Sequence, residues 1–334
     1  MKRTLLLCLT ASLTSFWIGC KTKPKTSDEN TTSEPALVKA PAFSGDSAYA
    51  FVAKQVSFGP RVPNTKAHEA CGNWMVAKLK TYGFEVTEQK FTTTTYDGTR
   101  LKARNIIGSY NPAVAKRILL AAHWDTRPFA DKDTAKLKDK PFEGANDGGS
   151  GVGVMLEIAR LIHTSPGKPK VGVDLIFFDV EDWGEKDGMQ PVSVTQSFWA
   201  LGSQYWAKNP HKPGYSAYYG ILLDMVGAKG ARFPKEGSSV RYASSIVSTV
   251  WGMADRLGYS QYFPDDTGGD ITDDHTAVNE VLKIPMIDIV ETKIGNNMTF
   301  GSYHHTTRDN LANLDRNTLK AVGQTVTQVL YQEE

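Results

Sequence analysis

The sequence contains few cysteines, and their positions exclude an internal disulfide. Only three occur in 334 residues: Cys8 in an N-terminal apolar segment, Cys20 just after that segment, and Cys71 in a segment with helical periodicity. An exported protein without disulfides draws its stability from core packing or from a metal. We therefore expect Cys71 to be a buried apolar residue.

The sequence also lacks a strong excess of charge of one sign. The formal net charge is +2, and much of the basic excess lies near the N-terminus. A surface without a basic patch does not favour nucleic acid, so we expect no nucleic-acid partner.

No apolar run is long enough to span a bilayer. The longest, Leu5 to Ile18, follows two basic residues and precedes Gly19-Cys20, which is typical of an export signal. We expect residues 1–19 to be a signal peptide and Cys20 to be lipidated, which would make the protein periplasmic and membrane-anchored through lipid alone. An ordinary cleaved signal, with Cys20 incidental, is the alternative.

The composition changes after the apolar run. Residues 20–42 are rich in Lys, Thr, Ser, Glu and Pro and cannot bury enough apolar surface to fold, so we expect a flexible tether. Residues 43–334 contain no linker-like break and have the length of a single α/β enzyme. We expect them to form one catalytic domain.

Strand-like and helix-like patterns alternate along residues 43–334. This alternation predicts an α/β fold, a three-layer αβα sandwich with a mixed, mostly parallel central sheet, because a hairpin must be antiparallel. The predicted elements are a Thr65-capped helix to Tyr82, a hairpin over 84–110, strands over 117–122, 173–178, 219–223 and 285–290, and helices over 148–163, 241–257 and 317–331, with a further helix that includes Ser197, Trp199 and Trp206.

Acidic residues and a histidine follow several of these predicted strands. His123 and Asp125 follow the first, Glu181-Asp182 the second, and Asp224 the third. The carboxyl ends of parallel strands share one edge of a sheet, so we expect these side chains to converge there. The long loops 126–143 and 183–195 are expected to cover that edge.

Glu181-Asp182 is the strongest local signal. Two adjacent acids after a mostly apolar strand repel each other unless a cation or a proton intervenes. One acid could bind zinc while the other remains free to transfer protons; a solvated strand end is the alternative. Asp147, before the glycine-rich Gly148-Gly-Ser-Gly151, could be a metal ligand or a helix N-cap.

Histidines and further acids follow in the last third of the chain. The stretch from Asp265 to Asp274 holds five aspartates without the spacing of a calcium loop, so a solvated loop is the simplest interpretation. For the histidines of the Tyr-His-His-Thr turn at 303–306, the sequence favours a role as metal ligands over burial in the core. We expect the other isolated histidines to be surface residues: His68, His163 and His211.

These motifs resemble those of the zinc aminopeptidase superfamily, and within it the glutaminyl cyclase branch, over about residues 45–331. The resemblance is carried by Gly144-Ala-Asn-Asp-Gly-Gly-Ser-Gly151, Phe178-Asp-Val-Glu181, Ser197-Phe-Trp-Ala-Leu-Gly-Ser203, Leu222-Leu-Asp-Met-Val-Gly-Ala228, Asp273-Asp-His275 and His305-Thr-Thr-Arg-Asp-Asn-Leu311.

The resemblance implies a single zinc and a glutamine pocket. Zinc would be bound by Asp147, Asp182 and His305, and Glu181 would be the proton shuttle. Asp224 and Asp273 would complete an acid network beside it. The walls of the glutamine pocket would be Trp199, or Trp183 in its place, with Phe300 and His304. Position 182 is Asp where the family usually has Glu, and position 304 is His where the animal enzymes have Trp.

The resemblance leaves a choice of reaction. A cyclase would convert the N-terminal glutamine of peptides or proteins to pyroglutamate and release ammonia. An aminopeptidase would bind a second zinc through His123 and Asp224, with Asp147 bridging both ions. A non-catalytic binding protein on the same scaffold is a third hypothesis, which the intact set of acids disfavours.

Overall fold

The computed structural model describes residues 36–193, 195–292 and 300–334. Contacts within the chain group Leu37–Glu334 into one compact unit. The predicted signal peptide, Cys20 and most of the tether lie outside the described residues. Within the described ranges, no helix is both long and apolar enough to cross a bilayer.

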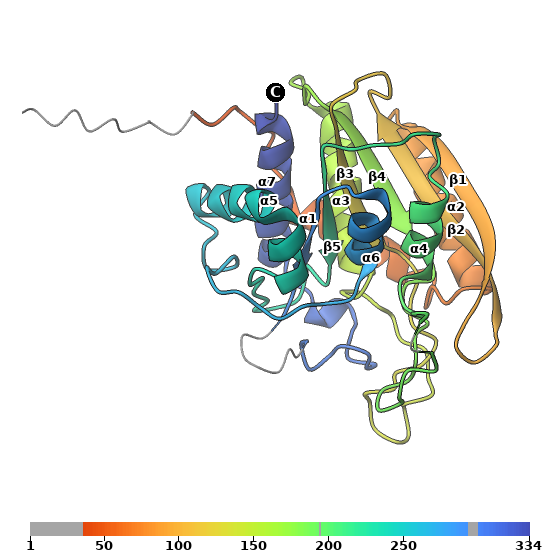
Figure 1. The fold of residues 1–334 in the computed structure, drawn as a ribbon. Helices are drawn as coiled ribbons and strands as arrows, with labels where there is room; N and C mark the ends of the chain where they lie inside the picture. The colour runs from red at the N-terminus through yellow and green to blue at the C-terminus, as the bar shows by residue number, and fades with distance from the viewer. Residues whose placement is uncertain (1–35, 194, 293–299) are drawn as a thin grey trace, which may run out of the picture. The chain divides into compact units, whose positions relative to one another are not determined.

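A six-stranded mixed sheet forms the centre of this unit (Figure 1). Its spatial order is β1-β2-β4-β3-β5-β6, with β1 and β2 antiparallel to their neighbours and β4, β3, β5 and β6 mutually parallel. The mixed, mostly parallel sheet was predicted. The strand bounds are β1 Glu85–Thr94, β2 Arg100–Tyr110, β3 Arg117–His123, β4 Gly172–Phe178, β5 Tyr219–Asp224 and β6 Met286–Val290.

Helices cover both faces of the sheet, which confirms the three-layer prediction. One face packs against α2, α3, α5 and α7, with α1 lying on α3 and α7; the other packs against α4, α6 and the π-helical turn Val278–Leu282. The helices are α1 Gly45–Val56, α2 Lys66–Thr81, α3 Gly149–Thr164, α4 Leu201–Lys208, α5 Gly237–Arg256, α6 Asp274–Ala277 and α7 Arg316–Gln332, with a 3₁₀ turn at Leu311–Asn313.

The four parallel strands are buried along their whole length and are mostly apolar because both faces of this part of the sheet are covered. In β3, Ile118 and Leu120 join the larger core, whereas Leu119 and Ala121 join the smaller core on the opposite face. Successive side chains of a strand point to opposite faces, so one uninterrupted apolar run supplies both cores.

Most predicted elements are present, with shifted ends. Thr65 caps α2 and accepts a hydrogen bond from the His68 amide. Cys71 is fully buried in α2, as predicted. Helix α4 begins only at Leu201, and α1 was not predicted. The surface prediction for His68 was wrong: α2 packs against β1 and β2, and the His68 side chain is buried there between Asp179 and Trp124.

The loops that leave β3 and β4 extend from the same end of the sheet. In Figure 1 the segments 126–143 and 183–193 run together from that end. Their residues line a pocket at the carboxyl edge of the parallel strands, which agrees with their predicted position over this edge.

Candidate active site

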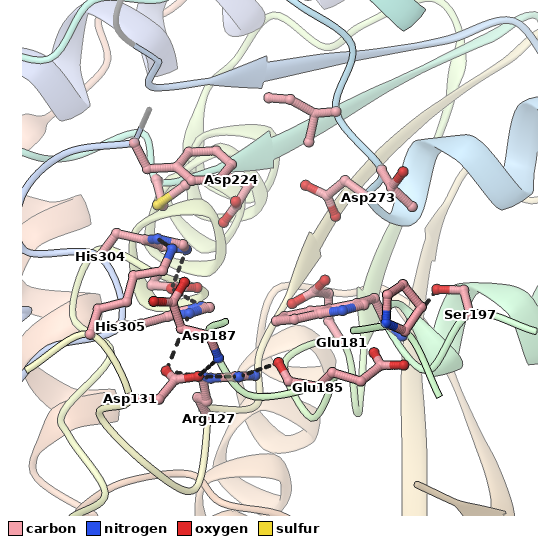
Figure 2. A pocket seen from close by; sticks show the side chains of 18 of the residues that line it. Arg127, Asp131, Glu181, Glu185, Asp187, Ser197, Asp224, Asp273, His304 and His305 are labelled. Carbon is pink, nitrogen blue, oxygen red and sulfur yellow. Dashed lines mark hydrogen bonds and ion pairs between the residues drawn. The ribbon is translucent and has the colours of Figure 1, made fainter. Parts of the chain in front are cut away.

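A pocket of about 690 Å³ opens at the carboxyl ends of β4, β3 and β5. Figure 2 shows His304 and His305 on one side of it and Glu181 and Asp273 on the other. Residues from loops 127–132, 185–199 and 300–305 complete the lining. Side chains far apart in the sequence therefore meet in one cavity.

Asp147 and Asp182 each place one carboxylate oxygen near the His305 ring. The His305 Nε2 atom lies 3.1 Å from Asp182 Oδ1 and 3.7 Å from Asp147 Oδ2. Both of these oxygens are buried and lack a hydrogen-bond partner among the described residues. Buried polar atoms normally have partners, so a ring nitrogen and two orphaned carboxylate oxygens form a donor set suited to a cation such as zinc.

The backbone of Asp147 is fixed by a second aspartate. Buried Asp309 accepts hydrogen bonds from the amides of Asn146 and Asp147 at 2.8 and 3.0 Å. Gly148, with φ of 74°, precedes α3 in the N-cap position. Asp147 is therefore not the N-cap of α3, and its carboxylate is directed into the pocket, where Oδ1 lies 3.0 Å from His123 Nε2.

One carboxylate oxygen of Asp182 accepts a hydrogen bond, and the other has no hydrogen-bond partner among the described residues. Its Oδ2 accepts from the Arg127 amide at 3.1 Å, which leaves Oδ1 facing His305. The preceding turn is held by Asp125, whose two oxygens accept from the amides of Glu181 and Asp182 at 3.1 and 3.3 Å. Burial, followed by the charge of Asp147, raises the pKa of Asp182 well above its ordinary value. A cation here would relieve that repulsion.

His305 is held as a neutral ring. Burial and the charge of Arg127 lower its pKa to about 3. Its Nδ1 faces Asp131 Oδ1 at 3.7 Å, and its backbone, at φ of 55°, accepts a hydrogen bond from the Lys132 amide. A neutral imidazole with Nε2 free is the form that binds metals.

Three acids face the other side of the pocket. Burial, opposed by His123 and reinforced by Asp273 and Asp182, raises the pKa of Glu181 well above its ordinary value. Burial and the charge of Asp224 raise the pKa of Asp273 to about 7. Glu181, Asp224 and Asp273 are thus buried acids whose surroundings favour their protonated forms.

His123 connects the two halves of the site. Its Nε2 lies 3.0 Å from Asp147 Oδ1 and 3.2 Å from Asp224 Oδ1. Burial opposes its protonation, but the neighbouring carboxylates of Asp125, Asp147 and Asp224 raise its pKa well above the ordinary value. Among the described residues, two sets of three have ligand atoms within 4.8 Å of one another: His123-Asp147-Asp224 and Asp147-His304-His305.

Aromatic rings form the pocket walls. The Trp199 ring is parallel to that of His305 with centroids 6.0 Å apart, and Phe300 lies 4.4 Å from His304. All three predicted wall residues, Trp199, Phe300 and His304, line the pocket. Trp183, offered as the alternative to Trp199, packs instead against the small cluster of Leu101, Ala103, Val180 and Leu201.

A model of peptidase family M28 matches residues 105–330. This chain belongs to peptidase family M28. Two solved structures align with nearly all of its described residues. A zinc-dependent exopeptidase from Parabacteroides distasonis is 52% identical (88% of this chain, 100% of that chain, TM-score 0.85). A Bacteroides thetaiotaomicron glutaminyl cyclase bound to N-acetylhistamine is 50% identical (89% and 100%, TM-score 0.85).

Curated relatives of this M28 chain are more distant. The glutaminyl-peptide cyclotransferase of Bos taurus is 28% identical over 246 residues, which are 64% of this chain. The chain spans 62% of that relative's length.

The sequence did not identify several residues that orient the groups of this M28 site. Arg127 and Asp131 form a buried pair, with nitrogen-oxygen distances of 3.0 and 2.6 Å, beside Asp182 and His305. Asp309 was seen only as part of a polar run. Arg127 and Asp309 contact backbone groups in distant parts of the sequence, those of Asp182 and Asp147, so no local pattern indicates these roles.

Proposed function

We propose that this chain is a zinc-dependent glutaminyl-peptide cyclotransferase. Its substrates are peptides or proteins with an N-terminal glutamine, and its products are the pyroglutamyl peptide and ammonia. The likeness to the Bacteroides cyclase across 100% of that chain supports the reaction class. The convergence of Asp182 and Asp147 on His305 Nε2 is the observation that carries the proposal.

The donor set fits one zinc ion. Asp147 Oδ2, Asp182 Oδ1 and His305 Nε2 are the atoms that would bind it, and the neutral state of His305 suits that role. Bound zinc supplies a Lewis acid that polarises the side-chain carbonyl of the substrate glutamine. Although Asp182 is one methylene shorter than Glu, its Oδ1 already faces His305 at 3.1 Å.

Glu181 moves the proton in this mechanism. As the substrate's α-amine attacks the side-chain amide carbon, Glu181 accepts a proton from that nitrogen. It returns the proton to the departing amide nitrogen, which leaves as ammonia while the five-membered lactam closes. The carboxylate ends the cycle as it began. Burial and the like charges of Asp273 and Asp182 keep the proton affinity of Glu181 high, and Asp224 acts on this network through Asp273, whose pKa it raises.

The pocket walls hold the glutamine folded. Trp199, Phe300 and His304 enclose the space next to Glu181, and a side chain confined there keeps its amine close to its own amide carbon. Because nucleophile and electrophile belong to one molecule, this confinement supplies much of the rate.

A two-zinc aminopeptidase is the second candidate, because His123, Asp147 and Asp224 form a second set of potential ligands. We favour the cyclase because of the likeness to the Bacteroides thetaiotaomicron glutaminyl cyclase. In addition, the carboxylates of Asp125, Asp147 and Asp224 around His123 favour its protonated form, and a protonated imidazole cannot bind a metal. Two tightly held zinc ions per chain, together with release of free amino acid from aminoacyl-anilides, would contradict the cyclase.

We further propose that residues 1–19 are an export signal, that 20–42 tether the protein through lipidated Cys20 in the periplasm, and that 43–334 form the catalytic domain. Metabolic labelling with palmitate tests the anchor. Labelling that persists in Cys20→Ser would contradict it.

The cyclase is tested with a synthetic glutaminyl peptide. We expect stoichiometric ammonia release and loss of one ammonia from the peptide mass. Glu181→Gln should lower kcat by roughly 10²- to 10⁴-fold, the range for general acid-base catalysis, while retaining zinc. Turnover that survives removal of zinc by a chelator, or an unchanged kcat in Glu181→Gln, would overturn the proposal.

A further inference from the structure

The turn that presents Glu181 and Asp182 has an unfavourable backbone conformation. Val180 has φ of 54° and is fully buried. A β-branched residue in the left-handed region is a strained conformation that persists only when its surroundings impose it. Other parts of the fold must therefore hold the segment from Asp179 to Asp182, four residues that follow directly after β4.

The Asp179 carboxylate provides much of that restraint. It is fully buried. Its Oδ1 accepts from His68 Nε2 at 2.8 Å and from the Val180 amide at 2.9 Å, and its Oδ2 accepts from the Arg104 amide at 2.6 Å. Its own amide donates to Asn105 Oδ1 at 3.0 Å. The strained residue is thus bonded directly to a carboxylate that α2 and β2 hold in place.

His68 connects this carboxylate to the rest of the site. Its ring, on α2, stacks on the Trp124 indole with centroids 4.1 Å apart. Trp124 is fully buried between His123 and Asp125 in the sequence, and its amide donates to the Phe178 carbonyl at 3.0 Å. His68 therefore contacts both strand ends that carry the acids of the pocket, although it lines no part of that pocket.

We propose that His68 and Asp179 are positioning residues that fix the Asp179–Asp182 turn, so that Glu181 meets the reacting amide and Asp182 meets the metal. The roles of those two acids rest on the proposed function. Without the pair, Val180 can relax out of its left-handed conformation, and both side chains rotate with the backbone. Misplacement of a catalytic group by about 1 Å lowers rates by up to about 10²-fold.

The chain offers a matched control on the same strand. Asp174 in β4 is also fully buried and accepts from Ser109 at 2.5 Å, from Tyr215 at 2.9 Å and from Arg117. It lies toward the amino end of β4, away from the pocket. Asp174→Asn should lower the melting temperature and leave kcat of the folded protein unchanged.

Two variants test the pair in the full-length protein. Asp179→Asn places an NH₂ group against a backbone N–H, and His68→Phe keeps the stacking on Trp124 but removes the donor. We expect both to lower kcat for a glutaminyl peptide by about 10- to 100-fold, the usual effect of losing an orienting partner, with KM nearly unchanged. His68→Gln, which restores a donor, should recover part of the loss.

Zinc affinity, measured by competition with a chromophoric chelator, gives a readout that does not depend on the reaction. We expect Asp179→Asn to weaken it by about 10- to 100-fold and Asp174→Asn to leave it unchanged. If the wild-type protein binds zinc but releases no ammonia, the proposed function fails while the affinity comparison still tests the pair. Wild-type kcat and zinc affinity in His68→Phe, or in Asp179→Asn if His68→Phe does not fold, would overturn the inference.

Discussion

The Nζ atom of Lys132 lies 2.9 Å from Nδ1 of His304. An ammonium group can only donate, so Nδ1 of His304 is the acceptor and carries no proton. The His304 ring is thereby fixed between Phe300 on one side and His305 on the other, at centroid distances of 4.4 and 3.7 Å. One wall of the pocket thus depends on a residue from the long loop after β3.

Lys132→Met is expected to weaken substrate binding. Loss of one hydrogen bond of about 1 to 1.5 kcal/mol lowers kcat/KM by roughly five- to tenfold. The effect should fall mainly on KM, because the wall contacts the substrate before and during the reaction. Steady-state kinetics with a glutaminyl peptide measures it. Lys132→Arg, which keeps a donor, is the control, and equal kinetics in both variants would disprove this role.

Asp182→Asn is expected to release the metal. The substitution leaves at most one neutral oxygen where Oδ1 now faces His305, so zinc affinity should fall by at least about 100-fold, beyond what loss of an outer partner causes. Zinc content after dialysis is the measurement. The exposed Asp139→Asn in the loop after β3 should retain the wild-type content; equal retention by Asp182→Asn would remove Asp182 from the ligand set.

Replacing two helical glycines by alanine should change the free energy of unfolding in opposite directions. A Cβ at Gly151, in the first turn of α3, would overlap the carbonyl oxygen of Leu223 and approach the Ala122 Cβ. Gly151→Ala should therefore cost about 1 to 3 kcal/mol in unfolding free energy, as overpacking does. A Cβ at Gly252 meets nothing within 4 Å, so Gly252→Ala should stabilise α5 by about 0.5 to 1 kcal/mol. Urea denaturation distinguishes the two.

Stability should depend on pH through Glu236. This carboxylate caps α5 by accepting from the amides of Ser238 and Ser239, and it lies 3.3 Å from His275 Nε2. Burial opposes ionisation, but the contacts with His275 and the backbone amides lower its pKa from 4.5 to about 2.

A carboxylate whose pKa is lower in the folded than in the unfolded state stabilises the folded state at pH values above its unfolded pKa. The contribution is complete above about pH 5 and is lost as pH falls from 4.5 toward 2. A shift of this size corresponds to about 3 kcal/mol. Glu236→Gln should therefore be destabilised at pH 7, with a difference from wild type that shrinks near pH 3. A difference independent of pH in urea titrations would contradict the assignment.

Much of the fold could be predicted because its signals are local. The Thr65 cap, the hairpin over 84–110 and the mostly apolar parallel strands each result from interactions within a few residues. Helix α1 was missed, and α4 begins at Leu201 rather than near Ser197, where the chain passes through a left-handed Ala200 after the pocket loop. Tertiary packing decides such boundaries.

His68 illustrates what local pattern cannot reveal. In the sequence it is an isolated histidine near the start of a helix, without acidic companions that suggest a role. Its partner Asp179 lies 111 positions away, and only the packing of α2 beside β2 and β4 brings the two within 2.8 Å.

The sequence alone determined the chemistry available to this protein: acids and histidines at strand ends, a glycine-rich turn before a helix, and two wholly apolar strands that required cover on both faces. Only the tertiary structure decided which oxygens remained free. The Arg127 amide donates a hydrogen bond to one oxygen of Asp182. The carboxylates of Asp125 and Asp309 accept hydrogen bonds from the amides of Glu181 and Asp147. One oxygen of Asp147 and one of Asp182 have no such partner, and both face His305. The selection depends on distances across the fold, which the linear order of residues does not encode.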